Sequence, residues 1–162
     1  MWSKAPSRRA ALLGLLALGG CGFAPVYGGA NAKLLDQIAY QTPDNAGGFA
    51  LRQQFRLRLG TATAPRLQLQ ADLSLQSRSA AVSAEGARTR INLIGTSNWV
   101  LRDRQTGARL ASGQARAFTS YSATGSTIAT QTSDVDATNR LATILADMIV
   151  SELLMSDVGE SL

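Results

Sequence analysis

The spacing of apolar residues changes along this chain, and that change constrains its fold more than any other feature. Between residues 66 and 76 apolar and polar side chains alternate, which is typical of a strand with one buried and one wet face. After Ser133 the apolar residues recur at helical spacing instead. The members of this stripe are Ala137, Leu141, Ile144, Leu145, Met148, Ile149 and Leu153. The sequence therefore predicts a long final helix packed on a sheet, with Ser133 as its N-cap and Asp134 and Asp136 in its first turn.

Two long extended segments precede this helix. They cover residues 89–103 and 108–120 and are joined by residues 104–107. Gly107 can supply the positive φ that a tight turn requires. The two segments therefore predict a β-hairpin.

The segment 49–60 fits two structures. Its apolar residues occupy odd-numbered positions, as in a strand, and three of them also recur every four residues, as in a helix. The odd-numbered set is Phe49, Leu51, Phe55, Leu57 and Leu59, and the helical subset is Leu51, Phe55 and Leu59. Asp44 or Asn45 could cap a helix here, so periodicity leaves helix and strand open. Residues 34–40, before Pro43 and the turn-like 44–48, are interpreted as a strand.

The first 20 residues have the order of a secretory signal. Lys4, Arg8 and Arg9 occur without any acid, an apolar run covers residues 10–18, and two glycines follow. The apolar run is about half the ~20 residues that a membrane-spanning helix needs. We therefore interpret residues 1–20 as a signal peptide and not as an anchor.

Cys21, the single cysteine, follows this signal directly. Residues 18–21 resemble the lipobox of bacterial lipoproteins, in which the cysteine sulfur is lipidated and becomes the first residue of the mature chain. A free or buried cysteine after an ordinary signal is the alternative. Several acyl chains at Cys21 would make the membrane anchor effectively permanent. In Gram-negative lipoproteins, an aspartate directly after the lipidated cysteine favours retention in the inner membrane. This chain has Gly22 at that position, so we expect the protein in the outer membrane.

The charge of the mature chain is small. The full sequence has 16 basic and 11 acidic residues, but three basic residues lie in the signal, which leaves a net charge of +2. Apart from Lys33, every mature basic residue is arginine. This composition allows an acidic partner and does not indicate nucleic acid. About 140 mature residues are enough for one domain.

Residues for catalysis are scarce. The sequence has no histidine, its one thiol is the expected lipid attachment site, and no serine lies in a nucleophile motif. Asp134 and Asp136 could hold a metal, but capping of a helix explains them as well. We therefore expect no enzyme, no metal and no cofactor other than the covalent lipid on Cys21.

The residues that follow the signal carry a resemblance. The segment Cys21-Gly22-Phe23-Ala24-Pro25-Val26-Tyr27-Gly28 resembles the start of mature proteins of the LptE family, the lipopolysaccharide-assembly lipoproteins, in their alphaproteobacterial form. Residues 101–107, 112–113, 119–121, 136–137 and 145–149 are similar to the same family.

The resemblance implies an α+β fold. Its four-stranded, mostly antiparallel sheet would have two helices packed on one face, in the order β-α-β-β-β-α, and residues 45–60 would form the first helix. The expected organisation is a signal peptide at 1–20, a lipidated tether at 21–33, one domain at 34–155 and a short tail at 156–162.

The resemblance also implies partners. Family members lie inside the LptD outer-membrane β-barrel, support its assembly and help it pass lipopolysaccharide to the cell surface. A barrel of around 26 strands is wide enough for a small domain. We expect LptD, lipopolysaccharide and the outer membrane as partners, and no nucleic acid. Arg88, Arg90 and Arg116 are the candidate lipopolysaccharide contacts, although solvated edge charges would look the same.

Two other classes of function remain open. The chain could be an accessory subunit of another lipid or envelope transport complex, or a lipid-anchored hydrolase. The absence of histidine argues against the hydrolase.

Overall fold

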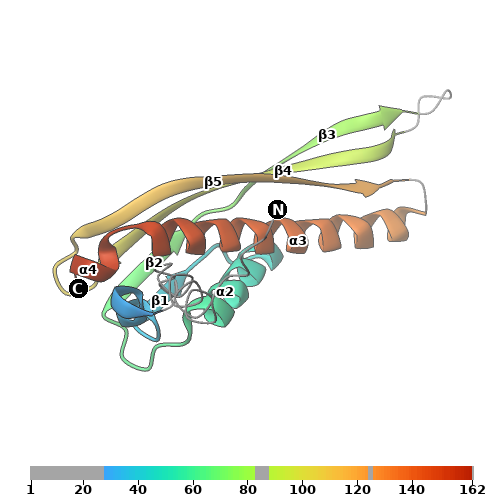
Figure 1. Cartoon of the computed structure of the whole chain (residues 1–162). Helices are drawn as coiled ribbons and strands as arrows, with labels where there is room; N and C mark the ends of the chain where they lie inside the picture. Colours follow the sequence, from blue (N-terminus) through green and yellow to red (C-terminus); the bar gives the residue numbers. More distant parts are fainter. Residues whose placement is uncertain (1–27, 83–87, 124–125, 162) are drawn as a thin grey trace, which may run out of the picture.

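The structure, a computed structural model, describes residues 28–82, 88–123 and 126–161 (Figure 1). The expected signal peptide and Cys21 lie outside the described residues. The elements in chain order are η1 (Gly29–Leu34), β1 (Ile38–Gln41), α2 (Ala46–Leu59), β2 (Leu67–Ala71), β3 (Ser74–Val82), β4 (Arg88–Asp103), β5 (Arg109–Ser122), α3 (Thr127–Met155) and α4 (Val158–Ser161).

The strand β4 is the centre of the sheet. On one side it pairs with β5 along its length, and on the other with β3 and then β2, all antiparallel. The short strand β1 adds to β2 in parallel. The expected α+β class, with a largely antiparallel sheet, is therefore confirmed, and so is the hairpin of β4 and β5, where Gly107 has the expected positive φ of 72°.

The sheet has five strands and not four, because the strand expected over residues 66–76 is two strands. Asp72 lies at the break. Its carboxylate accepts hydrogen bonds from the backbone N–H of Asn98 at 2.7 Å and from its side-chain amide at 2.9 Å. The carbonyl of Asp72 accepts from the Ser97 hydroxyl at 2.6 Å. These bonds replace the regular ladder at this point, so β2 and β3 pair with different parts of β4.

The two helices lie on one side of the sheet, with α3 along β4 and β5 and α2 beside β1 (Figure 1). Odd-numbered residues of β4 face the helices, and six of them are buried: Leu93, Gly95, Ser97, Trp99, Leu101 and Asp103. Even-numbered residues of β4 face the opposite side. The core therefore lies between one face of the sheet and the helices.

Residues 46–59 form the helix that periodicity alone left open. Asn45 caps it, since its side chain accepts from the N–H of Gly48 at 2.8 Å. The helical subset Leu51, Phe55 and Leu59 is completely buried, whereas Phe49 and Leu57 are exposed. The helix ends at Gly60, whose φ of 85° suits glycine.

The helix α3 begins earlier than predicted. Its N-cap is Ser126, whose side chain accepts from the N–H of Ala129, and not Ser133. Ser133 lies inside the helix and donates to the carbonyl of Ala129 at 2.9 Å. The first turns of α3 bury nothing large, and Ile128 is 77% exposed. The apolar stripe begins at Ala137, nearly three turns after the start of the helix at Thr127.

The predicted strand over residues 34–40 is also shorter than expected. Leu34 ends η1, and only Ile38–Gln41 is extended. Asp36 has a φ of 57°, which interrupts any strand at this point. The side-chain amide of Asn31 donates to the carbonyl of Leu154 at 2.9 Å, and Leu34 and Val158 are buried. Within the segments expected as tether and tail, η1 and α4 are thus helices that pack on each other.

Candidate ligand-binding face of the sheet

The sheet face opposite the helices carries mainly uncharged polar side chains. None of the described helices packs on it. Gln68 donates to Gln41 at 2.6 Å, and Gln114 donates to Asn98 at 2.7 Å, so amide groups bridge neighbouring strands. This is a wet, hydrogen-bonding surface, and the register also places five exposed arginines on it: Arg78, Arg90, Arg102, Arg109 and Arg116.

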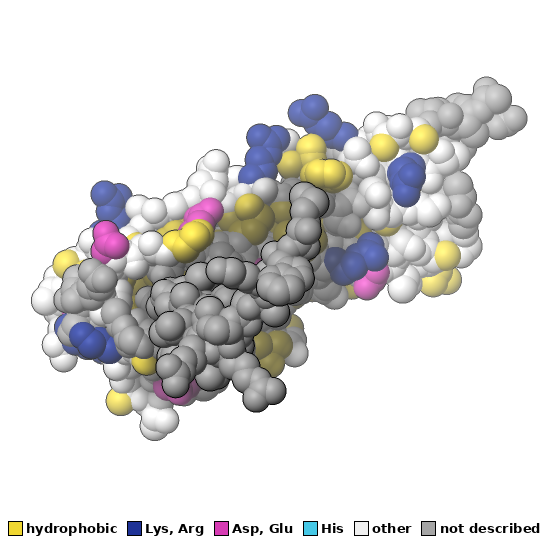
Figure 2. All heavy atoms as spheres, viewed as in Figure 1, with side chains coloured by type: hydrophobic (Ala, Val, Ile, Leu, Met, Phe, Trp, Pro, Cys, Tyr) yellow, Lys and Arg dark blue, Asp and Glu magenta, His cyan; other side chains and the backbone are white. Residues whose placement is uncertain are grey.

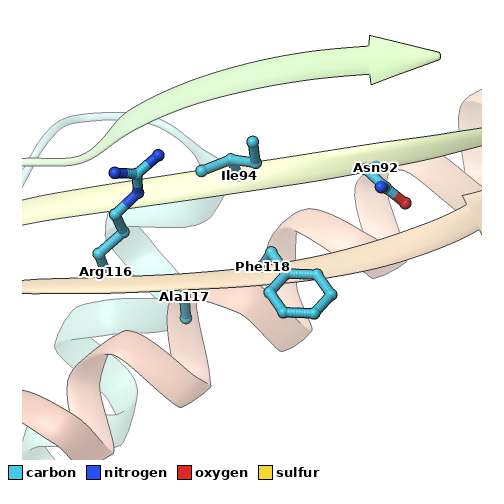
Figure 3. A pocket seen from close by; sticks show the side chains of 5 residues that line it. All are labelled: Asn92, Ile94, Arg116, Ala117 and Phe118. Atoms are coloured by element: carbon cyan, nitrogen blue, oxygen red, sulfur yellow. The ribbon is translucent and has the colours of Figure 1, made fainter. Parts of the chain in front are cut away.

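One depression on this face combines apolar surface with a cation. Its volume is about 490 Å³, and it is lined by Asn92, Ile94, Arg116, Ala117 and Phe118. The register places Ile94 opposite Phe118 and Thr96 opposite Arg116, so β4 and β5 contribute neighbouring side chains. Phe118 is 71% exposed. Figure 3 shows Arg116 extending from β5 across β4, beside Ile94.

The chemistry of this depression suits an amphiphile with an acidic group. Ile94 and Phe118 offer apolar surface, and the guanidinium of Arg116 offers paired N–H donors to a phosphate or carboxylate. Within the described part of the chain, Arg116 makes no salt bridge that would occupy these donors. The open shape admits a chain or a headgroup but encloses neither.

The structure does not bring the three predicted arginines together. Arg116 lines the depression. Arg90 is exposed on the same face but lies far from Arg116. The residue opposite Arg116 is Thr96, and Arg90 lies six residues from Thr96 along β4, a distance of about 20 Å at the rise of a strand. Arg88 begins β4 opposite Val82, and its side chain is not among those described. Figure 2 shows Lys and Arg side chains at separate places in that view and not in one patch.

Sequence reasoning missed Arg78. It lies on β3 opposite Asn92, on the same face as Arg116, and is exposed. No pattern in the sequence indicated it, because β3 exposes both of its faces and has no apolar alternation after Gln76. Arg78 therefore extends the cationic side of this face toward the edge of the sheet.

The groups with shifted pKa values lie elsewhere and are structural. Burial, together with the charge of Asp36, raises the pKa of Tyr40 to about 12, and its hydroxyl donates to the carbonyl of Gly60 at 2.8 Å. Burial and Asp134 raise the pKa of Tyr121. Hydrogen bonds from the N–H groups of Thr106 and Gln105 lower the pKa of Asp103, which stabilises the hairpin turn.

Asp134 and Asp136, considered above as possible metal ligands, lie inside α3. Within residues 28–82, 88–123 and 126–161, no three Cys, Asp or Glu side chains gather as a metal site would require. Over the same residues, no helix has the length and hydropathy to cross a membrane.

The fold is shared with crystallised bacterial lipoproteins. A putative lipoprotein from Caulobacter crescentus CB15 superposes with a TM-score of 0.64 at 21% identity, over 78% of this chain and 96% of that one. Rare lipoprotein B from Shewanella oneidensis superposes with a TM-score of 0.59 at 14% identity, over 78% of this chain and 99% of that one. A minor lipoprotein from Acinetobacter baumannii superposes with a TM-score of 0.52 at 15% identity, over 75% of this chain and 92% of that one. A comparison with curated proteins finds no match.

The sequence itself matches a family profile. Residues 35–153 match the profile of LptE, described as lipopolysaccharide-assembly, and this range contains the whole sheet, α2 and nearly all of α3. The family is not enzymatic. Because the match covers well over half of the sequence, the chain belongs to the LptE family of lipopolysaccharide-assembly lipoproteins.

Proposed function

We propose that this protein is a lipid-anchored plug of the LptD β-barrel in the outer membrane. Lipid on Cys21 would hold it at the periplasmic side, and its domain would occupy the barrel lumen, support barrel assembly and take part in the transport of lipopolysaccharide to the cell surface. The observation that carries this proposal is the family match over residues 35–153.

The surface of the domain supports a place in a polar lumen. The interior of a large outer-membrane barrel is polar and wet. Gln41, Gln70, Asn98 and Gln114 give the open sheet face exposed amide groups that can exchange hydrogen bonds with such a wall or with trapped water.

The depression at Arg116 supports direct contact with lipopolysaccharide. Phosphate groups would pair with the guanidinium, and acyl chains would cover Ile94 and Phe118. Arg90 and Arg78, on the same face, would add weaker contacts at a distance. We therefore propose Arg116 as the leading contact, with Arg88 and Arg90 as outlying candidates.

The test is affinity purification of the tagged, lipidated protein from its own outer membranes, followed by mass spectrometry. The proposal predicts that an LptD barrel co-purifies with this protein at a ratio close to one to one. A Cys21→Ser variant is the control for the anchor and should be depleted from the outer membrane. Recovery of the protein alone, or with an inner-membrane transporter, would support the accessory-subunit alternative instead.

A further inference from the structure

The strand β5 forms an open edge of the sheet. Among the described residues it pairs with β4 alone, so one of its two sides has no neighbouring strand. In an antiparallel sheet, every second residue of such a strand directs its N–H and C=O groups away from the sheet. Over the 14 residues of β5, this edge therefore offers a long row of backbone donors and acceptors.

Apolar side chains of α3 lie beside this edge. A Cβ at Gly113 of β5 would lie 2.9 Å from Glu152 Oε2, so Glu152 lies over β5. Met148 and Met155 are four residues before and three residues after Glu152, which makes them its neighbours on the surface of the helix. The two methionines are 36% and 75% exposed, and with Glu152 they line a groove of about 460 Å³.

The helix α2 lies on the other side of α3. Gln54 of α2 donates to Asp147 at 2.9 Å, and Asn139 and Thr143 border the groove between the two helices. In the sheet, β5 and the strand β1, which packs beside α2, lie on opposite sides of β4. Figure 1 shows α3 running along β5. The two methionines therefore line the side of α3 that borders the outer edge of β5.

A strand added at this edge would meet two different surfaces, because its side chains would alternate between the two faces of the sheet. On the helix side β5 has only small residues at its centre, namely Gly113, Ala115 and Ala117. Side chains of the added strand would reach past them to Met148 and Met155. This side therefore favours apolar residues, to which flexible methionines adapt well.

The open face of β5 favours acidic side chains. Arg109 and Arg116 are exposed on it, and no Asp or Glu occurs between residues 109 and 122. Figure 3 shows Arg116 extending over β4. Within the described part of the chain it makes no salt bridge, so it can turn toward a carboxylate one strand away. Opposite charges on directly neighbouring strands stabilise their pairing.

We propose that the outer edge of β5 binds an extended segment of a partner protein in which apolar and acidic residues alternate. Backbone hydrogen bonds to β5 supply affinity, apolar side chains cover Met148 and Met155, and carboxylates pair with Arg109 and Arg116. The edge and the methionines belong to the domain whether or not it lies in a barrel. A carboxylate at Arg116 would compete with a phosphate in the depression for the same guanidinium.

A second copy of this chain fits the edge less well. Antiparallel pairing of β5 with itself, centred on the middle of the strand, would bring two copies of Arg116 together. Like charges directly opposite each other on neighbouring strands are destabilising. A strand with carboxylates has the opposite effect, so the charge of β5 favours a different protein.

A labelled peptide tests the proposal. The probe is a short fluorescent peptide that alternates valine and glutamate, and its binding to the full, lipidated protein in detergent is measured by fluorescence anisotropy. The same peptide with lysine in place of glutamate should bind about tenfold more weakly. Met148→Gln and Arg116→Gln should each weaken binding of the glutamate peptide severalfold. Leu57→Gln, at an exposed apolar residue of α2, is the matched control and should leave the affinity unchanged.

Hydrogen exchange locates the bound peptide. Amide exchange should slow in residues 110–121 of β5 and not in residues 74–81 of β3, which form another edge of the sheet. Protection of β3 instead, equal binding of both peptides, or no binding of either would overturn the proposal. Slow exchange along the whole of residues 110–121 before peptide is added would also overturn it, because another part of the chain would then cover the edge. A complex of twice the mass without peptide would show that a second copy occupies it instead.

Discussion

Arg116 differs from the other candidate arginines because its guanidinium extends over apolar surface. Ile94 and Phe118 line the same depression, and together the three side chains present one charge and two apolar surfaces. Arg109, which lies opposite Arg102 and does not line the depression, offers charge alone. The difference matters because a ligand with both phosphate and acyl groups gains from the first arrangement and not from the second.

Arg116→Gln should therefore weaken lipopolysaccharide binding by about tenfold, the effect of one hydrogen-bonded charge. Phe118→Ser should weaken it as well, through the acyl chains. Displacement of a fluorescent lipopolysaccharide from the purified protein measures both. Arg109→Gln on the same strand is the matched control and should change nothing. Equal losses in Arg109→Gln and Arg116→Gln would mean that only net charge attracts the ligand.

Asp103 makes the hairpin turn sensitive to acid. Its pKa is lowered by hydrogen bonds from the N–H groups of Thr106 and Gln105, with a smaller contribution from Arg66. A lowered pKa in the folded state means that the stabilisation is complete above the ordinary pKa of aspartate and is lost as the pH falls through the lowered value. Asp103→Asn should lower the melting temperature at pH 7, and the gap to the wild type should close toward pH 2. A gap that is constant with pH would contradict this explanation.

At the scale of elements, Trp99 and Glu152 connect the sheet to α3. The indole N–H donates to the carboxylate at 2.9 Å, and Gly113 makes room for the pair. A Cβ at residue 113 would lie 2.8 Å from Trp99 Nε1 and 2.9 Å from Glu152 Oε2. The contact between strand and helix therefore depends on the absence of a side chain at this residue.

Gly113→Ala should destabilise the domain by roughly 1–3 kcal/mol in urea denaturation, because the indole or the carboxylate must move. Without residues 1–20, Trp99 is the only tryptophan, so its fluorescence reports on this contact alone. The emission should shift to the red in Gly113→Ala. Gly107→Ala, at a positive φ with open space around it, should lower stability without that shift. An unshifted spectrum in Gly113→Ala would exclude the proposed clash.

The first turns of α3 depend on their cap because they bury little. Ser126→Ala should cost about 1 kcal/mol locally and speed amide hydrogen exchange in residues 127–133, with little change in the rest of the helix. Ser133→Ala is the comparison, since that hydroxyl donates to a carbonyl inside the helix and caps nothing. Similar exchange in both variants would show that Ser126 does not determine where α3 begins.

The elements that the sequence predicted well are those that bury one continuous face. The β4–β5 hairpin has such a face, and so has α3 between Ala137 and Leu153, although Ile144 and Met148 of the predicted stripe are exposed. In α2 the exposed Phe49 and Leu57 added a false strand period to a real helix. Periodicity reports burial, so an exposed apolar residue misleads it.

Elements that bury little left no pattern to find. Residues 74–81 of β3 are exposed on both faces, and the start of α3 is held by hydrogen bonds of serine and threonine. The break at Asp72 and the positive φ of Asp36 depend on tertiary hydrogen bonds. Local sequence does not encode such bonds, which is why these boundaries differed from expectation.

At the scale of the whole molecule, the domain has two different sides. The helix side carries exposed apolar residues, including Phe49, Leu57, Met148 and Met155. The open sheet side carries amides and the depression at Arg116. Sequence reasoning selected Arg116 from its place on the return arm of the hairpin. It could not select Ile94, Phe118 or Arg78, because only the cross-strand register brings them onto the same face.

The two sides allow a direct test of the central claim that the domain lies inside a barrel. Photo-crosslinking residues would replace three exposed glutamines: Gln53 on α2, Gln70 on β2 and Gln131 on α3. In intact cells, a domain enclosed by LptD should crosslink to that one barrel from all three positions. Crosslinks from only one side, or to proteins other than LptD, would contradict the plug.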